Sequence, residues 1–182
     1  QLSVEQAIEL AKECEQAGFA ADPKITNSEG ATVSTSESQF IYANSLDFMG
    51  GYPVSRHSVS CALIAEHNES KQRDYWYSVA RDAVDLESAQ QIRRKTGLRS
   101  AARLGARKIA TCEVPVIFEA PIASSLIGHF ASAISGGSLY RKSSFLLASI
   151  GEQVFAPDIQ ILDLPYLPTG LGSGPFDEDG VA

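Results

Sequence analysis

A period of two among the apolar residues of positions 53–66 constrains the fold more than any other feature of the sequence. The alternate apolar positions are Val59, Cys61, Leu63 and Ala65. Successive side chains of a β-strand point to opposite faces, so this alternation predicts a strand with one buried face. The polar residues 68–71 then predict a turn, and residues 74–79 predict an antiparallel return strand.

Two short runs with strand-like composition precede this strand, at residues 32–35 and 40–43. The polar residues 36–39 between them predict a turn, and residues 47–51, which include paired glycines, predict a loop. Residues 25–82 are therefore expected to form an antiparallel meander of about four strands.

A helix is expected before the meander, in a section that covers about residues 1–20. Ser3 and Gln6 have the spacing of a capping box, and apolar residues follow at helical intervals over about residues 4–17. Gly18 suits the end of this helix, because glycine readily adopts the left-handed backbone found at helix C-termini.

Residues 85–150 are expected to form helices around one short strand. Asp85 is predicted to cap a helix that starts at about residue 86, and the apolar residues 114–118 predict a buried strand. A second helix, from about residue 122, has an apolar stripe that is expected to face a core, and the glycines at 136–137 end it.

The remaining sequence favours loops. Residues 140–150 allow one more helix, whereas the tail at residues 151–182 is rich in Pro and Gly and predicts a loop around one strand at 159–162. The fold class predicted from these patterns is α+β, an antiparallel β-meander with packed helices.

Charge is distributed unevenly along the chain. The net charge of −7 argues against binding of bulk nucleic acid. Residues 88–112 contain no acid, and residues 143–182 contain no base. These two zones either contact each other or are solvated separately. Within the first zone a basic stripe with a spacing of four, either a solvated helix face or a surface for DNA, consists of Lys95, Arg99, Arg103 and Arg107.

The composition also indicates the compartment. The three cysteines lie far apart, which is typical of free thiols in a reducing cytosol. The longest apolar stretch, residues 114–134, contains prolines, a glutamate and a histidine, which disfavours a membrane span. A cytoplasmic location is therefore expected.

Motifs for catalysis are scarce. The sequence contains no His-Glu-x-x-His, Cys-x-x-Cys or Gly-x-Ser-x-Gly motif and no phosphate-binding loop with its lysine. His57 is expected to pack or to form a hydrogen bond within a strand, and His67 to be solvated in a turn. His129, on a predicted helix, is either a satisfied core group or a ligand.

A second local feature combines glycines with cations. It consists of Gly136, Gly137, Arg141 and Lys142. Backbone amides beside positive charge can hold a carboxylate or a phosphate, so these residues are a candidate contact for an anion or a peptide. The alternative is a helix break followed by the charged start of another helix.

Several segments carry a resemblance to a known family. They are residues 24–30, 56–60, 64–66, 73–75, 107–109, 115–129, 136–143 and 175–181. In this order they resemble the TldD/PmbA family over essentially the whole chain. The resemblance implies the central part of a TldD/PmbA-type fold, so residues 1–182 are expected to be a single central fragment of a longer protein.

The resemblance implies a function in peptide proteolysis or maturation. In this family TldD-type subunits are zinc metallopeptidases that work with a second type of subunit on unfolded or modified peptides. This chain is similar to the second type. Family members are cytosolic and dimeric, and the second type is also described as a modulator of DNA gyrase.

The zinc motif of the family, His-Glu-x-x-x-His on a helix, is similar to residues 129–134 here. His129 matches the first ligand, but Phe130 stands in place of the general base and Ile134 in place of the second ligand. Phenylalanine cannot accept a proton and isoleucine cannot coordinate a metal.

The resulting expectation is a non-catalytic subunit with no cofactor of its own, in which zinc belongs only to a TldD-type partner. The expected partners are a TldD-like subunit and an extended or unfolded peptide, with a dimer as the assembly and no membrane or nucleic acid. Two alternatives stay open. One is an active metallopeptidase with ligands that do not align, and the other is a gyrase modulator that acts by direct binding.

Overall fold

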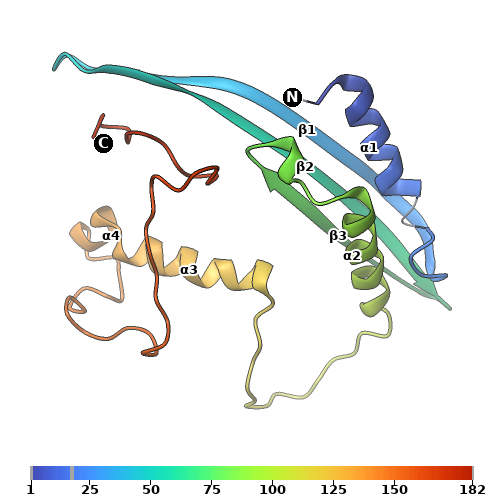
Figure 1. The fold of residues 1–182 in the computed structure, drawn as a ribbon. Coiled ribbons are helices and arrows are strands. Elements are labelled where there is room, and N and C mark those ends of the chain that lie inside the picture. The colour runs from blue at the N-terminus through green and yellow to red at the C-terminus, as the bar shows by residue number, and fades with distance from the viewer. Residues whose placement is uncertain (1, 17–18, 182) are drawn as a thin grey trace. The chain divides into compact units, whose positions relative to one another are not determined.

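The computed structural model describes residues 2–16 and 19–181 and divides the chain into two compact units (Figure 1). The first unit comprises Gln1–Lys108 and Leu164–Ala182, and the second comprises Ile109–Asp163. The expectation of a single central fragment came from the family resemblance and did not include this division. The predicted helix end at Gly18 lies outside the described residues.

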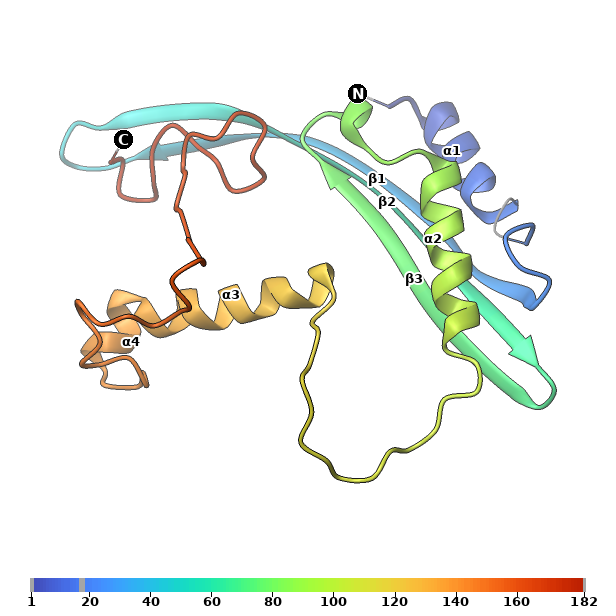
Figure 2. The ribbon, with the colours of Figure 1, turned by 60° about the horizontal axis from the view of Figure 1, so that its bottom comes forward.

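The first unit contains a three-stranded antiparallel sheet in the order β1-β2-β3 (Figures 1 and 2). Its strands are β1 (Ile25–Ala43), β2 (Met49–His67) and β3 (Ser70–Ala80). Because β3 pairs only with residues 57–67 of β2, the β1–β2 hairpin continues beyond the sheet as a two-stranded ribbon. We call this ribbon, residues 36–56, the arm.

The arm corrects two predictions. Residues 36–39, predicted as a turn, lie inside β1, and the turn occurs at residues 44–48. The sheet therefore has three strands instead of about four. Polar residues form strand here because a two-stranded ribbon exposes most of both faces. Gly50 and Gly51, predicted in a loop, belong to β2, where a Cβ on Gly51 would lie 2.9 Å from the Phe40 carbonyl oxygen.

The predicted alternation in β2 is confirmed. Val59, Cys61, Leu63 and Ala65 are all buried. They face α1 (Val4–Gln16) and α2 (Ala89–Ala102), which cover the same face of the sheet (Figure 2). Cys14 of α1 and Ile92 of α2 complete this core.

Capping boxes start both helices. In α1 the Gln6 amide donates to Ser3 Oγ over 3.2 Å and the Ser3 amide donates to Gln6 Oε1 over 2.8 Å, as predicted. The predicted cap at Asp85 is wrong, because α2 begins after Ser88. The reciprocal hydrogen bonds of Ser88 and Gln91 cap the N-terminus of this helix. Asp85 instead ends a short 3-10 helix, η1 (Ala83–Asp85). A pair of side chains that together satisfy two amides is a stronger start than a single carboxylate.

The second unit contains α3 (Ala120–Ile134) and α4 (Gly136–Tyr140). The strand predicted at 114–118 is wrong, since these residues have no regular structure and Ile117 is 96% exposed. Among the described residues, 114–118 pair with none of the three strands of the sheet. The helix predicted at 140–150 and the strand at 159–162 are also wrong, because these residues form turns and irregular structure.

Helix α3 is confirmed, but its environment differs from the prediction. Its apolar stripe was expected to face a core, yet Ile122 is 55% and Ile134 is 47% exposed. Ala133 is the only buried residue among those of α3. Gly136 and Gly137 do not simply end α3, because they also begin α4 after Ser135.

Candidate functional site

The helix that matches the family's zinc motif is well formed. Its first turn contains Pro121, whose fixed backbone suits a helix start, and Glu119 precedes it as the N-cap residue. His129 is exposed on this helix, and its imidazole forms no hydrogen bond with any described residue. The position that would need a general base holds Phe130, whose ring packs edge-to-face on Phe155 with centroids 5.0 Å apart.

These residues do not fit a zinc ion. Catalytic zinc sites use three protein ligands, and of the two ligand positions on this helix one holds the imidazole of His129 and the other the alkyl chain of Ile134, while a phenyl ring occupies the general-base position. Within the described part of the chain, no three His, Cys, Asp or Glu side chains gather closely enough to hold a metal. Phe130 thus acts as a packing residue at this position.

The other two histidines lie in the sheet. His57 of β2 is 3% exposed, and its Nδ1 lies 2.7 Å from Oγ1 of Thr35 in the paired strand β1, which confirms a packing and hydrogen-bonding role. His67 is exposed, as predicted, but it is the last residue of β2 instead of part of a turn.

The glycines and cations after α3 come together only in part. The Arg141 guanidinium folds back over Gly137, where a Cβ would lie 3.3 Å from Nη1. Lys142 has a φ of 56°, and Gly136 has open space around it. All four residues are exposed, and a role in holding an anion or a peptide stays a prediction.

Three residues of the predicted basic stripe form contacts within the protein, although Lys95, Arg103 and Arg107 are exposed. Lys95 forms an ion pair with Glu87 at 2.8 Å and lies 4.6 Å from the centre of the Trp76 ring. Arg99 and Arg103 both contact Oδ2 of Asp74, at 3.2 Å and 2.8 Å. Lys95, Arg99 and Arg103 thus stabilise the packing of α2 on β3.

Asp74 is the acceptor at the centre of this arrangement and is 7% exposed. Burial opposes its ionisation, but the hydrogen bonds from Arg103 and from the Tyr75 amide, together with the charges of Arg99 and Arg103, outweigh that effect. They lower the pKa of the Asp74 carboxyl below its ordinary value.

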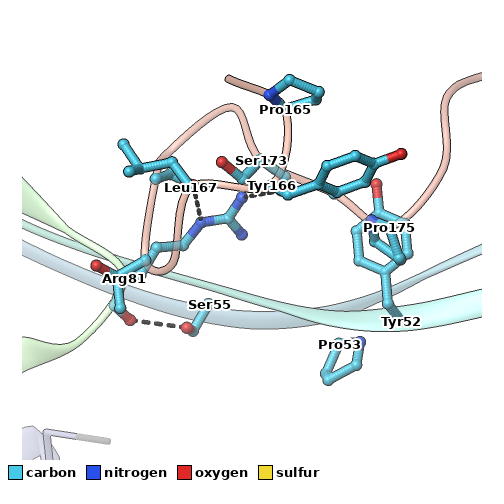
Figure 3. A pocket seen from close by; sticks show the side chains of 12 residues that line it. Tyr52, Pro53, Ser55, Arg81, Pro165, Tyr166, Leu167, Ser173 and Pro175 are labelled. Carbon is cyan, nitrogen blue, oxygen red and sulfur yellow. Dashed lines mark hydrogen bonds between the residues drawn. The ribbon is translucent and has the colours of Figure 1, made fainter. Parts of the chain in front are cut away.

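A cavity that the sequence did not predict lies between the sheet and residues 164–182, the part of the tail that belongs to the first unit (Figure 3). It has a volume of about 430 Å³, and its lining includes Tyr52, Ser55, Arg81, Pro165 and Tyr166. The Arg81 side chain holds the tail in place by donating to the carbonyl oxygens of residues 170, 171 and 173, over 3.2, 2.9 and 3.1 Å. Its own carbonyl accepts from Ser55 Oγ at 2.7 Å.

The antiparallel sheet with its long hairpin and packed helices is an α+β fold, and the helix α3 keeps one of the two zinc-ligand positions of the motif, at His129. Residues 1–108 match the family described as PmbA/TldA metallopeptidase central domain, and residues 111–182 match the PmbA/TldA metallopeptidase C-terminal domain. The chain belongs to this family, which confirms the resemblance inferred from the sequence. The boundary between the two matches agrees with the first boundary between the two structural units.

Similar proteins support the assignment. The chain is 41% identical over 181 residues to metalloprotease PmbA of Escherichia coli O157:H7, with 100% of this chain and 40% of that protein covered. It also matches solved structures of proposed modulators of DNA gyrase. The one from Thermotoga maritima has a TM-score of 0.87 and 27% identity and covers 99% of this chain and 41% of its own. The one from Bacteroides thetaiotaomicron has a TM-score of 0.90 and 25% identity, with 100% and 41% covered.

The chain therefore spans about two fifths of the length of the relatives it matches. None of the helices in the described ranges is long and apolar enough to cross a membrane.

Proposed function

We propose that this chain belongs to a non-catalytic subunit that supports a TldD-type zinc peptidase in peptide proteolysis or maturation. The observation that carries this proposal is the replacement of two of the three motif positions by Phe130 and Ile134. The ring of Phe130 packs on Phe155, so this position serves packing within the second unit.

In this proposal the zinc belongs to a TldD-like partner, and the two subunits assemble as a dimer in the cytoplasm. The family name and the name of the Escherichia coli relative both refer to metallopeptidase activity, which supports a role in proteolysis. A subunit without its own metal site contributes by assembly and by presenting substrate to its partner.

The surface proposed for peptide binding is an outer strand of the sheet. β1 and β3 each pair with β2 on one side only, so each has a row of backbone groups on its outer side. An extended peptide that adds to such an edge gains backbone hydrogen bonds that do not depend on its sequence. This mode suits a system that acts on many unfolded peptides.

Titration with an unfolded peptide tests the proposal, with the purified protein alone and together with a TldD-like partner. The matched control is the same peptide with N-methyl groups on alternate amides, which keeps its side chains but removes the donors along one edge. We expect the unmodified peptide to bind and the methylated one to bind at least about tenfold more weakly. Absence of binding in both settings would refute the proposal.

Direct action on gyrase or DNA is a second candidate function, because both solved relatives are named as proposed modulators of DNA gyrase. Binding to DNA would fall steeply with salt. Since Arg99 and Arg103 support the fold through Asp74, the test requires cations outside that contact, such as Arg94 and Arg107, both of which are exposed. DNA binding that is weakened by replacing Arg94 and Arg107 with Ala would favour this candidate.

A further inference from the structure

The arm and the tail enclose a second cavity next to the one that contains Arg81. It has a volume of about 470 Å³ and shares Tyr52, Pro165, Tyr166 and Gly174 with the first cavity. A volume of this size accommodates a long side chain of a peptide. Its lining differs from that of the first cavity, because the second one contains more aromatic rings and two carboxylates.

Three aromatic rings pack against one another in the wall of this cavity. Phe40 and Tyr52 come from the arm and Phe176 from the tail, with ring centroids 5.2 Å apart for Phe40 and Tyr52 and 5.3 Å for Tyr52 and Phe176. The second pair is edge-to-face at 82°. In such a pair one ring keeps both of its faces clear of its partner, and the ring face is the negative part of the aromatic quadrupole.

Glycines allow the arm and the tail to approach each other this closely. A Cβ on Gly50 would lie 2.9 Å from the Phe176 ring, and a Cβ on Gly174 would lie 2.7 Å from the Tyr52 hydroxyl. Gly180 has a φ of +80°, and a Cβ there would lie 2.8 Å from the ring of Phe48. The wall of the cavity is therefore closely packed.

Two carboxylates line the same cavity, those of Asp177 and Glu178. Oδ1 of Asp177 accepts from the amides of Asp179 and Val181, at 2.9 and 2.8 Å, which fixes the turn that carries both acids. Glu178 is exposed and forms no hydrogen bond or ion pair with any residue that the structure describes. Its carboxylate is therefore available to a ligand.

The charge of the surroundings is negative. Residues 143–182 contain no Lys, Arg or His. The nearest cation in the lining of the two cavities is Arg81, which lines the first cavity but not the second and whose guanidinium is occupied by backbone carbonyls. Aromatic rings and carboxylates around one cavity are a combination that binds an organic cation.

We propose that the second cavity binds the cationic side chain of a lysine or arginine residue in an extended peptide. The aromatic rings would contact the alkyl stem and the charged head, and Glu178 would form the ion pair. This inference rests on the proposed function, in that it adds a side-chain preference to a subunit that holds peptide. The preference would select peptides with a basic residue from among otherwise equivalent unfolded chains.

The test compares two unfolded peptides that are identical except for one position, lysine in one and norleucine in the other. Norleucine keeps the alkyl stem and removes the ammonium group. We expect the lysine peptide to bind roughly 5- to 30-fold more tightly, in the range of a cation–π contact combined with an ion pair. Isothermal titration of the purified protein measures both affinities.

Two variants of equal charge locate the effect. Glu178→Gln removes the carboxylate in the cavity, whereas Asp179→Asn removes a carboxylate on the next residue, which does not line the cavity. We expect Glu178→Gln to abolish most of the preference for lysine and Asp179→Asn to preserve it. Equal losses in both variants would show that long-range charge is responsible, and the inference would be overturned.

The outcomes separate this inference from the proposed function. If both peptides bind equally, the cavity has no preference for a cation and the inference fails, while the proposal that the subunit holds peptide survives. If neither peptide binds, with or without a TldD-like partner, both fail.

Discussion

Arg103 donates its Nε–H to Oδ2 of Asp74 over 2.8 Å, and this bond joins the end of α2 to the middle of β3. Arg99, one helical turn earlier, contacts the same oxygen. Two residues of the basic stripe are therefore directed toward a buried carboxylate of their own chain. This arrangement explains why a cluster of cations occurs in a protein with a net charge of −7.

Replacement of Asp74 by Asn should lower the free energy of unfolding at pH 7 by about 1–3 kcal/mol, because two arginines lose a partly buried partner. Glu69→Gln, an exposed carboxylate in the turn after β2, is the control and should change it by less than about 0.5 kcal/mol. Chemical denaturation measures both. An equal effect of the two substitutions would contradict the role assigned to Asp74.

The same contact predicts a pH dependence. The pKa of Asp74 is lower in the folded protein than its ordinary value of about 3.9, so its contribution to stability is complete above that value. The contribution is lost as the pH falls through the folded-state pKa. The difference in unfolding free energy between the unmodified protein and Asp74→Asn should therefore shrink below about pH 4. A difference that stays constant from pH 7 to pH 3 would exclude this linkage.

The start of α2 can be tested by two neighbouring substitutions. Ser88→Ala removes the hydrogen bond that Ser88 Oγ accepts from the Gln91 amide and keeps the amide of residue 88 that donates to Gln91 Oε1. It should cost about 1 kcal/mol of stability, within a range of roughly 0.5–2. Asp85→Ala should have little effect, because α2 does not begin at Asp85. Thermal or chemical unfolding of the two variants distinguishes them, and the reverse order of effects would restore Asp85 as the cap.

The packing of the core on β2 predicts that replacing a buried leucine lowers stability strongly, whereas replacing an exposed leucine has little effect. Leu63 is fully buried, so Leu63→Ala should destabilise the protein by about 2–5 kcal/mol. Leu46, at the end of the arm, is 86% exposed, and Leu46→Ala should change stability by less than about 0.5 kcal/mol. Similar values for the two variants would show that the sheet is not packed as described.

The cysteines should differ in reactivity. Burial is the main reason why the pKa of the Cys14 thiol is raised to about 11 and that of the Cys61 thiol to about 12. Cys112, in contrast, is exposed. At pH 8 a thiol reagent should therefore modify one cysteine per native chain and all three after unfolding. Rapid modification of three thiols in the native protein would contradict the burial of Cys14 and Cys61.

The core strand could be predicted because its alternation reflects burial on one face only. Val59, Cys61, Leu63 and Ala65 lie under two helices, so their period was informative. The arm could not be predicted in the same way, because a two-stranded ribbon exposes polar residues on both faces and its pattern resembles a turn. Its glycines, which usually indicate loops, are needed here for close packing against Phe40 and Phe176.

The candidate sites show the same limit. His129, Phe130 and Ile134 were identified because they follow one another on a helix and match a family motif. The two cavities were not, because their linings combine residues of the arm and of the tail, with Arg81 in the first cavity, and these segments lie far apart in the sequence. Only the Pro- and Gly-rich composition of the tail was visible, and it predicts loops without indicating what they pack against.

The most direct test of the central claim is peptidase activity and zinc content, measured for this protein alone and with a TldD-like partner. We predict that the protein alone has no peptidase activity and less than about 0.1 zinc per chain. His129→Ala should leave the activity of the pair unchanged. Stoichiometric zinc in the isolated protein, with peptidase activity that is lost in His129→Ala, would contradict the account.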